Sequence, residues 1–175
     1  MFKKNEAFPI VMITTGGTIE KVYNEFDGSL KNSSKPIGVQ ILSALRLPYT
    51  DIQLVPILAK DSLEMTDSDR QFLKKTIDKY LHSQRPVVVL HGTDSMRESA
   101  LYCYLNITSL RVPVIFTGAM RPFGFVDSDA TQNVTEALIA AKFLGPGIYV
   151  SFHGKVFSLP NVRKNKKKGT FEDSL

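Results

Sequence analysis

The sequence predicts an α/β domain built on a doubly wound parallel sheet. Five short apolar runs rich in Val and Ile recur along the 175 residues, and segments with helical periodicity lie between several of them. Such runs are typical of strands buried on both faces, and the alternation of strand and helix is typical of parallel sheets with right-handed crossovers. A chain of this length is expected to form one core, so we predict a single domain over residues 1–175.

The predicted strands cover residues 9–13, 52–58, 86–90, 112–116 and 148–152. The first predicted helix opens with the capping-box pattern Thr66-x-x-Asp69 and carries its apolar residues on one face as far as Leu81. A second box, Ser95-x-x-Glu98, predicts the next helix. A third, Ala-rich helix is predicted over 128–143, where Gly-Pro-Gly ends it.

Residues 21–36 break this alternation, because they are polar and turn-rich where a crossover helix is expected. The pair Asp27-Gly28 is typical of a hairpin turn. Long loops in compact domains are often lids, so the segment is interpreted either as a mobile flap over the sheet edge or as a plain surface excursion.

Composition excludes several classes of protein. The net charge of +5 is local, since residues 163–168 (RKNKKK) supply five of the 22 Lys and Arg residues. No aromatic residue interleaves with these lysines, so they predict a solvated, mobile segment rather than a nucleic-acid site. Cys103 is the only cysteine, and the three histidines are scattered, so neither a disulfide nor a metal site is expected. With no secretory signal and no membrane span, we expect a cytoplasmic protein.

Small polar and glycine residues follow every predicted strand, as TTGGT, AKDS, HGTD, TGAM and SFHG. Because the carboxyl ends of parallel strands share one rim, these segments are expected to converge on one pocket. Gly16 and Gly17 offer bare backbone N–H groups that suit an anion, but no dinucleotide or P-loop motif is present. Thr93 and Asp94 allow two interpretations, helix caps or site residues, and His91 suits a hydrogen-bonded structural role at a strand end.

Five of these motifs resemble, in order, those of the bacterial-type L-asparaginase family: TTGGTIE (14–20), DSLEM (61–65), HGTDSM (91–96), TGAMRP (117–122) and the lysine of NVRK (161–164). The resemblance runs from residue 10 to about 171 and covers only the N-terminal domain of that family. It implies a flavodoxin-like fold and an amidohydrolase that needs no cofactor. Such an enzyme releases ammonia from asparagine, or a related small side-chain amide, through a threonine acyl-enzyme.

The resemblance also implies residue roles. It places the nucleophile on Thr15 and, more weakly, a phenol over it on Tyr23. The other implied residues are a proton-shuttling trio, Thr93, Asp94 and Lys164, and a substrate-binding set, Gly16, Ser62, Glu64 and Gly92 together with Thr93 and Asp94. A base is needed because a threonine hydroxyl is a weak nucleophile until its proton is removed.

The sequence also departs from the family. Leu63 stands where many members have a polar residue that contacts the substrate amine, and Glu64 replaces an aspartate. The family's C-terminal domain, which supplies a carboxylate to the neighbouring subunit's site, has no counterpart in these 175 residues. The alternative function is therefore a non-catalytic module that binds a small amino acid or assists assembly. In either case we expect a homodimer or a higher homo-oligomer, because an uncovered domain exposes apolar surface.

Overall fold

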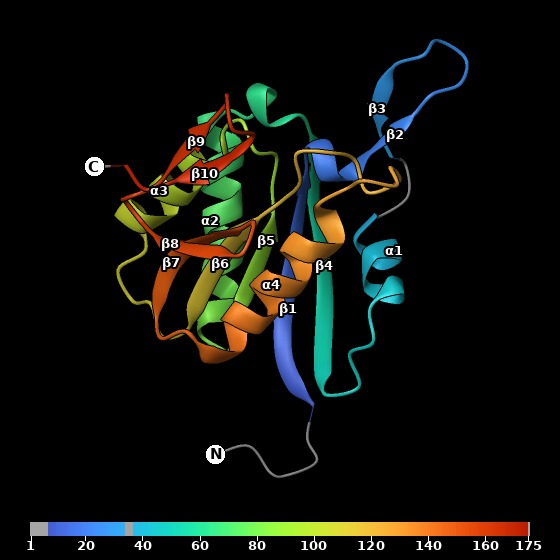
Figure 1. Cartoon of the computed structure of the whole chain (residues 1–175). Helices are drawn as coiled ribbons and strands as arrows, with labels where there is room; N and C mark the ends of the chain where they lie inside the picture. The colour runs from blue at the N-terminus through green and yellow to red at the C-terminus, as the bar shows by residue number, and fades with distance from the viewer. Residues whose placement is uncertain (1–6, 34–36, 175) are drawn as a thin grey trace.

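Six strands form the central sheet in the order β4-β1-β5-β6-β7-β8 (Figure 1). The computed structural model describes residues 7–33 and 37–174. The strands are β1 (Phe8–Gly16), β4 (Thr50–Lys60), β5 (Val87–Leu90), β6 (Pro113–Thr117), β7 (Gly147–Phe152) and β8 (Lys155–Ser158). The first five are parallel and follow the flavodoxin-like order 2-1-3-4-5, so the predicted α/β fold and all five predicted strands are confirmed. The sixth strand, β8, was not predicted and runs antiparallel to β7, so the sheet is mixed.

Helices cover both faces of the sheet. Along β1, Val11 and Ile13 pack with α2 (Asp67–Leu81) and α3 (Met96–Asn106), whereas Ile10 and Met12 pack with α1 (Ile37–Ala44) and α4 (Ala130–Phe143). Successive side chains of a strand point to opposite faces, which explains why an unbroken apolar run is needed here. Among the helices that the structure describes, none is long and apolar enough to cross a membrane.

Two of the three predicted helix starts behave as expected. The Thr66 side chain accepts from the Asp69 N–H while the Asp69 carboxylate accepts from the Thr66 N–H, so the first capping box is confirmed. The third predicted helix is confirmed as α4, which begins at Ala130. The second helix is present as α3, but its predicted capping box is wrong, because the Ser95 side chain makes no cap bond. Ser95 is buried and its hydroxyl donates instead to the backbone oxygen of Ser62.

The polar segment that follows β1 forms a hairpin of β2 (Lys21–Tyr23) and β3 (Leu30–Asn32), which confirms the turn predicted at Asp27-Gly28. Gly28 has φ +69°, a conformation that glycine adopts at little cost. Figure 1 shows the hairpin extending away from the sheet at the edge where α1 and β4 lie. The sequence missed α1, so the first crossover does contain a helix. Residues 34–36 of the predicted flap lie outside the described residues.

The basic run at 163–168 is more ordered than predicted. It forms β9 (Arg163–Asn165) and a turn that leads to β10 (Thr170–Glu172), and the two strands pair antiparallel. Glu172 accepts hydrogen bonds from Asn165, Lys168 and Arg163, which lower the pKa of its carboxyl to about 2. The positive charges of the segment are thus partly paired within the hairpin.

Cys103 is buried on α3, as its apolar sequence context predicted. Burial raises the pKa of its thiol to about 12, because the thiolate would lose its hydration. Cys103 therefore behaves as a small apolar core residue.

Gly17 provides a test of the packing at the end of β1. It has φ +85°, and a Cβ at this position would lie 2.3 Å from the Cα of Gly92. We expect Gly17→Ala to lower the free energy of unfolding by at least about 2 kcal/mol, measured by urea denaturation, because the backbone must shift. Gly145→Ala is the matched control, since nothing lies within 4 Å of its added Cβ. Equal stability of the two variants would contradict this account.

Candidate active site

Three strand-end segments meet at the carboxyl ends of β1 and β5. The chain leaves β1 for β4 on one side and continues to β5 on the other side, which makes this the switch point where ligands bind in open α/β sheets. Gly17 is in close contact with Gly92, and a Cβ on Gly92 would lie 2.6 Å from the Oγ of Ser62. The predicted convergence of the first three strand-end segments is therefore confirmed.

Lys164 joins this rim from the other end of the sequence. Its Nζ donates to the Thr93 Oγ1 at 2.7 Å and to an Asp94 carboxylate oxygen at 2.9 Å. The Lys164 side chain is only 17% exposed, although three lysines follow it in the hairpin turn. The three residues that the sequence grouped as a trio are thus in direct contact, with the lysine drawn out of solvent.

The three threonines of the first motif occupy different environments. Thr14 and Thr15 are both buried in β1, and the Thr15 hydroxyl donates to the backbone oxygen of Leu90 at 3.0 Å. Thr18 follows the glycine pair at the start of a short 3-10 turn (Thr18–Glu20) and is partly exposed. The burial and the hydrogen bond of Thr15 argue against the nucleophilic role that we predicted for it. Thr18, which the sequence analysis did not assign to the site, is the one of these three threonines that is not buried.

Glu20 ends the same turn and is buried. Burial raises the pKa of its carboxyl, although hydrogen bonds from Thr14 and Gly16 act in the opposite direction. The side chain therefore ties the turn to the end of β1.

Three of the predicted site residues are exposed, namely Tyr23, Glu64 and Asp94. Tyr23 is 59% exposed on β2, and its hydroxyl lies near the hairpin turn, 3.7 Å from where a Cβ on Gly28 would be. The phenol is therefore directed along the hairpin. Glu64 is exposed in the short turn Ser62–Glu64, next to Leu63, which is 74% exposed.

His91 orients the backbone of the site. It is fully buried, and burial lowers the pKa of its imidazole to about 4, so the ring is neutral at ordinary pH. Its Nδ1 lies 2.8 Å from the Gly92 oxygen, to which it donates. In a planar trans peptide the N–H points opposite to the C=O, so the Thr93 N–H is directed away from His91. This bond fits the structural role predicted for His91.

Among the described residues, no group of three or more His, Cys, Asp or Glu side chains is suited to hold a metal ion.

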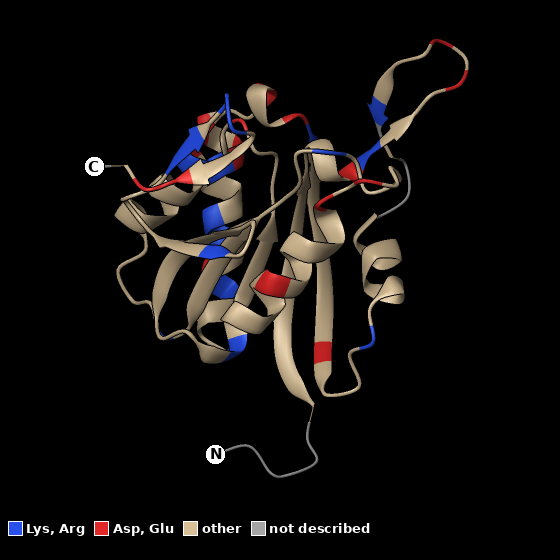
Figure 2. Ribbon diagram, in the orientation of Figure 1, with Lys and Arg blue, Asp and Glu red and all other residues tan. Residues whose placement is uncertain are grey.

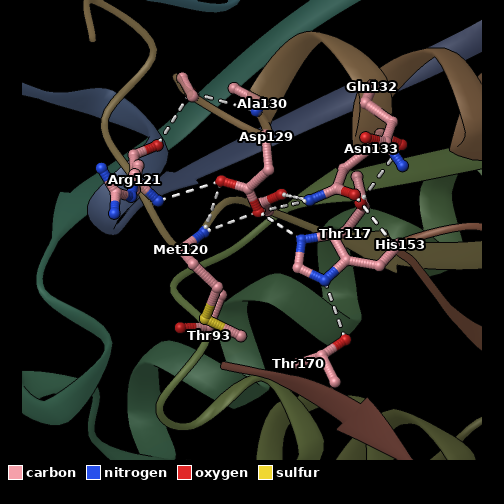
Figure 3. Close-up of polar contacts among 12 residues, drawn as sticks. Thr93, Thr117, Met120, Arg121, Asp129, Ala130, Gln132, Asn133, His153 and Thr170 are labelled. Atoms are coloured by element: carbon pink, nitrogen blue, oxygen red, sulfur yellow. Dashed lines mark hydrogen bonds and ion pairs between the residues drawn. The ribbon is translucent and has the colours of Figure 1, made fainter. Parts of the chain in front are cut away.

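A second polar cluster lies after β6 and β7 and was missed by sequence reasoning (Figure 3). The Asp129 carboxylate accepts from the N–H groups of Met120 and Arg121 and is 2.9 Å from the Nε2 of His153. The His153 Nδ1 lies 2.9 Å from the Thr170 Oγ1. The sequence signal was the polar segment SFHG after the fifth strand, to which no partner was assigned.

Charged residues of both signs surround this end of the sheet. Figure 2 shows them in the β9–β10 hairpin and in the turns near β2, while the opposite ends of the central strands carry few. Lys21 and Asp61 form one of the pairs at 2.6 Å, and Lys60 and Asp69 another at 2.8 Å. These pairs fix the turns that follow β1 and β4.

The chain is similar to known proteins. Residues 9–172 match the family model described as "Asparaginase, N-terminal". The L-asparaginase of Thermococcus kodakarensis is 28% identical over 155 residues, covering 89% of this chain and 47% of the relative. The L-asparaginase of Bacillus licheniformis is 30% identical over 161 residues, covering 89% of this chain and 49% of the relative.

The solved structure of the thermostable L-asparaginase from Thermococcus kodakarensis superposes with a TM-score of 0.85 at 27% identity. The alignment covers 95% of this chain and 51% of that one. This chain thus spans about half the length of the relatives that it matches. With a match to the family model over residues 9–172 and the same fold, the chain belongs to the asparaginase family, in the part described as its N-terminal domain.

Proposed function

We propose that this chain is an L-asparaginase-like amidohydrolase, which converts asparagine or a related small side-chain amide to the acid and ammonia. One observation carries the proposal. Gly17 and Gly92 are in contact, and on this basis we place the two residues that follow them, Thr18 and Thr93, at the same opening of the switch point. Lys164 is bonded to the second of these threonines. A hydroxyl beside a lysine-bound hydroxyl provides the two groups that amide cleavage through an acyl-enzyme requires.

The nucleophile in this proposal is Thr18 rather than Thr15. Attack requires a hydroxyl that reaches the substrate carbonyl carbon, and the buried Thr15 hydroxyl is already used in a bond to Leu90. Thr18 is partly exposed and follows the turn that packs against Gly92. The proposal therefore retains a threonine acyl-enzyme, in which the ester forms on Thr18 instead of Thr15.

The proton moves through Thr93, whose hydroxyl is oriented by Lys164. An ammonium group only donates, so the Thr93 oxygen accepts from Lys164 and directs its own proton away from the lysine. As Thr18 attacks, its proton passes to Thr93 while the Thr93 proton passes to the departing amide nitrogen. The new O–C bond replaces the C–N bond, ammonia leaves, and water later hydrolyses the ester. Asp94 holds Lys164 in place throughout.

Backbone and side-chain groups bind the substrate. The Thr93 N–H, which points away from His91, stabilises the oxyanion, and the contact of Gly16 and Gly17 with their neighbours shapes the turn below it. The Ser62 hydroxyl, against Gly92, contacts the α-carboxylate of the substrate. Asp94 and Glu64 are exposed carboxylates on the same rim and attract its ammonium group.

Isosteric variants distinguish the two candidate nucleophiles. We expect Thr18→Val to lower the rate of ammonia release from asparagine at least about a hundredfold, because the attacking oxygen is removed. Thr15→Val should keep most of the activity and lose about 1 to 3 kcal/mol of stability, since Leu90 loses its donor. The reverse order of activities would return the role to Thr15. Calorimetric binding of asparagine without ammonia release in the wild type would favour the non-catalytic module.

Lys164 is tested against a neighbour on the same hairpin. Lys164→Ala should lower kcat about a hundredfold or more, because Thr93 loses the donor that orients its hydroxyl for proton transfer, and should leave KM nearly unchanged. Lys166→Ala is the control, since Lys166 is exposed in the turn after β9. A similar loss in both variants would indicate that only the charge of the hairpin matters.

The homo-oligomer expected from the sequence stays a prediction, and one surface supports it. A hollow of about 380 Å³ between α4 and β8 is lined mainly by apolar side chains, including Ile139, Phe143 and Val156. Phe143 is 81% exposed there. Light scattering should give at least twice the chain mass of 19.5 kDa, and Phe143→Glu should reduce it. A monomeric wild type would contradict this prediction.

A further inference from the structure

The Asp129 carboxylate joins the turn after β6 to the start of α4. It accepts from the N–H groups of Met120 and Arg121 at 3.0 Å and from the Asn133 side chain at 2.9 Å. Burial by itself raises the pKa of Asp129, but these N–H groups and His153 together hold it below its ordinary value. The group is therefore an ionised acceptor with four donors around it (Figure 3).

His153 is the one donor of this set that comes from the turn between β7 and β8. It has φ +47°, a left-handed conformation in which Asn, Asp and His are enriched among the residues other than glycine. Its backbone N–H donates to the fully buried Asn133, which keeps the ring over Asp129.

The other ring nitrogen of His153 reaches the hairpin that carries Lys164. Its Nδ1 is 2.9 Å from the Thr170 Oγ1, at the start of β10. In the neutral ring, Nε2–H donates to Asp129, so Nδ1 accepts from the Thr170 hydroxyl and both ring atoms are satisfied. Thr170 precedes Phe171, which pairs directly with Lys164 across the two strands.

Phe171 and Thr170 thus anchor β10 in two different ways. The Phe171 ring is buried with its centroid 5.0 Å from that of Phe152, which holds the hairpin against the sheet. A ring contact is non-directional, whereas the bond from Thr170 to His153 sets the position of the strand along its length. The reach of Lys164 to Thr93 depends on that position.

We propose that His153 is a positioning residue for Lys164. Through Asp129 and Thr170 it ties the lysine-bearing hairpin to the turn that follows β6, so that the Lys164 Nζ stays on the Thr93 hydroxyl. The consequence for catalysis depends on the proposed amide hydrolysis, whereas the positioning of Lys164 does not.

The experiment measures Lys164 directly, in the full chain. Acetic anhydride labels lysines in competition, and mass spectrometry gives the labelling rate of Lys164 relative to the exposed Lys166. Thr170→Val keeps the shape of the side chain and removes the hydroxyl. We expect it to raise this ratio about three- to tenfold, the change typical of one lost hydrogen bond, and Thr170→Ser to restore the wild-type ratio.

A His153 variant tests the same hydrogen bond between Thr170 and His153 from its other partner. His153→Ala should raise the ratio as Thr170→Val does, and the double variant should raise it no further, because one link is broken in both cases. His82→Ala, an exposed histidine that ends α2, is the matched control and should leave the ratio unchanged. Unfolding midpoints identify any variant that fails to fold. If either His153→Ala or Thr170→Val fails to fold, the other variant still tests the hydrogen bond between these two residues.

Activity separates the two proposals. In an active enzyme, Thr170→Val should lower kcat by the same factor by which the labelling ratio rises, with KM unchanged, because Lys164 orients the Thr93 hydroxyl and does not bind substrate. If the wild type releases no ammonia but the variants show the expected rise in the labelling ratio, the positioning role is supported and the proposed function is overturned. Unchanged labelling in both variants overturns the positioning role, whether or not the enzyme is active.

Discussion

The close approach of two glycines, Gly17 and Gly92, is the constraint on which the site depends. A methyl group on Gly17 would overlap the backbone of Gly92, and a methyl group on Gly92 would overlap the Ser62 side chain, so the three turns can meet here only because both residues are glycine. The sheet order makes β1 and β5 neighbours and sends their following turns to opposite sides. In the proposed site, the next residue of each turn, Thr18 or Thr93, supplies a hydroxyl at this point.

The second half of the site comes from an element outside the sheet. Lys164 lies on a hairpin whose own strands are only three residues long, and such a pair has little stability by itself. Its position is therefore set by its contacts with the domain, through the buried Phe171 and the chain from Thr170 to Asp129. This dependence explains why a polar cluster remote in sequence from the threonines bears on the lysine.

Several elements were predictable because their signals are local. The buried strands, the Thr66 capping box and the hairpin turn at Asp27-Gly28 each follow from a few adjacent residues, and the structure contains all three. Local signals failed where a tertiary partner competed. Ser95 has the sequence of a helix cap, yet its hydroxyl bonds to Ser62 because folding brings the second strand-end segment beside it. In the same way Thr15, in a motif that marks a site, is buried by the strand that it ends.

The sequence by itself determined the α/β class, the family and the set of polar segments at the strand ends, because periodicity and motif order are properties of the chain alone. Only the tertiary structure decided that Thr15 is buried while Thr18 is partly exposed, that Lys164 contacts Thr93 across 71 positions, and that His153 bridges Asp129 and Thr170. The physical reason is that exposure and hydrogen-bond partners depend on side-chain direction after packing. A one-residue change along a strand reverses that direction, and no local pattern records it.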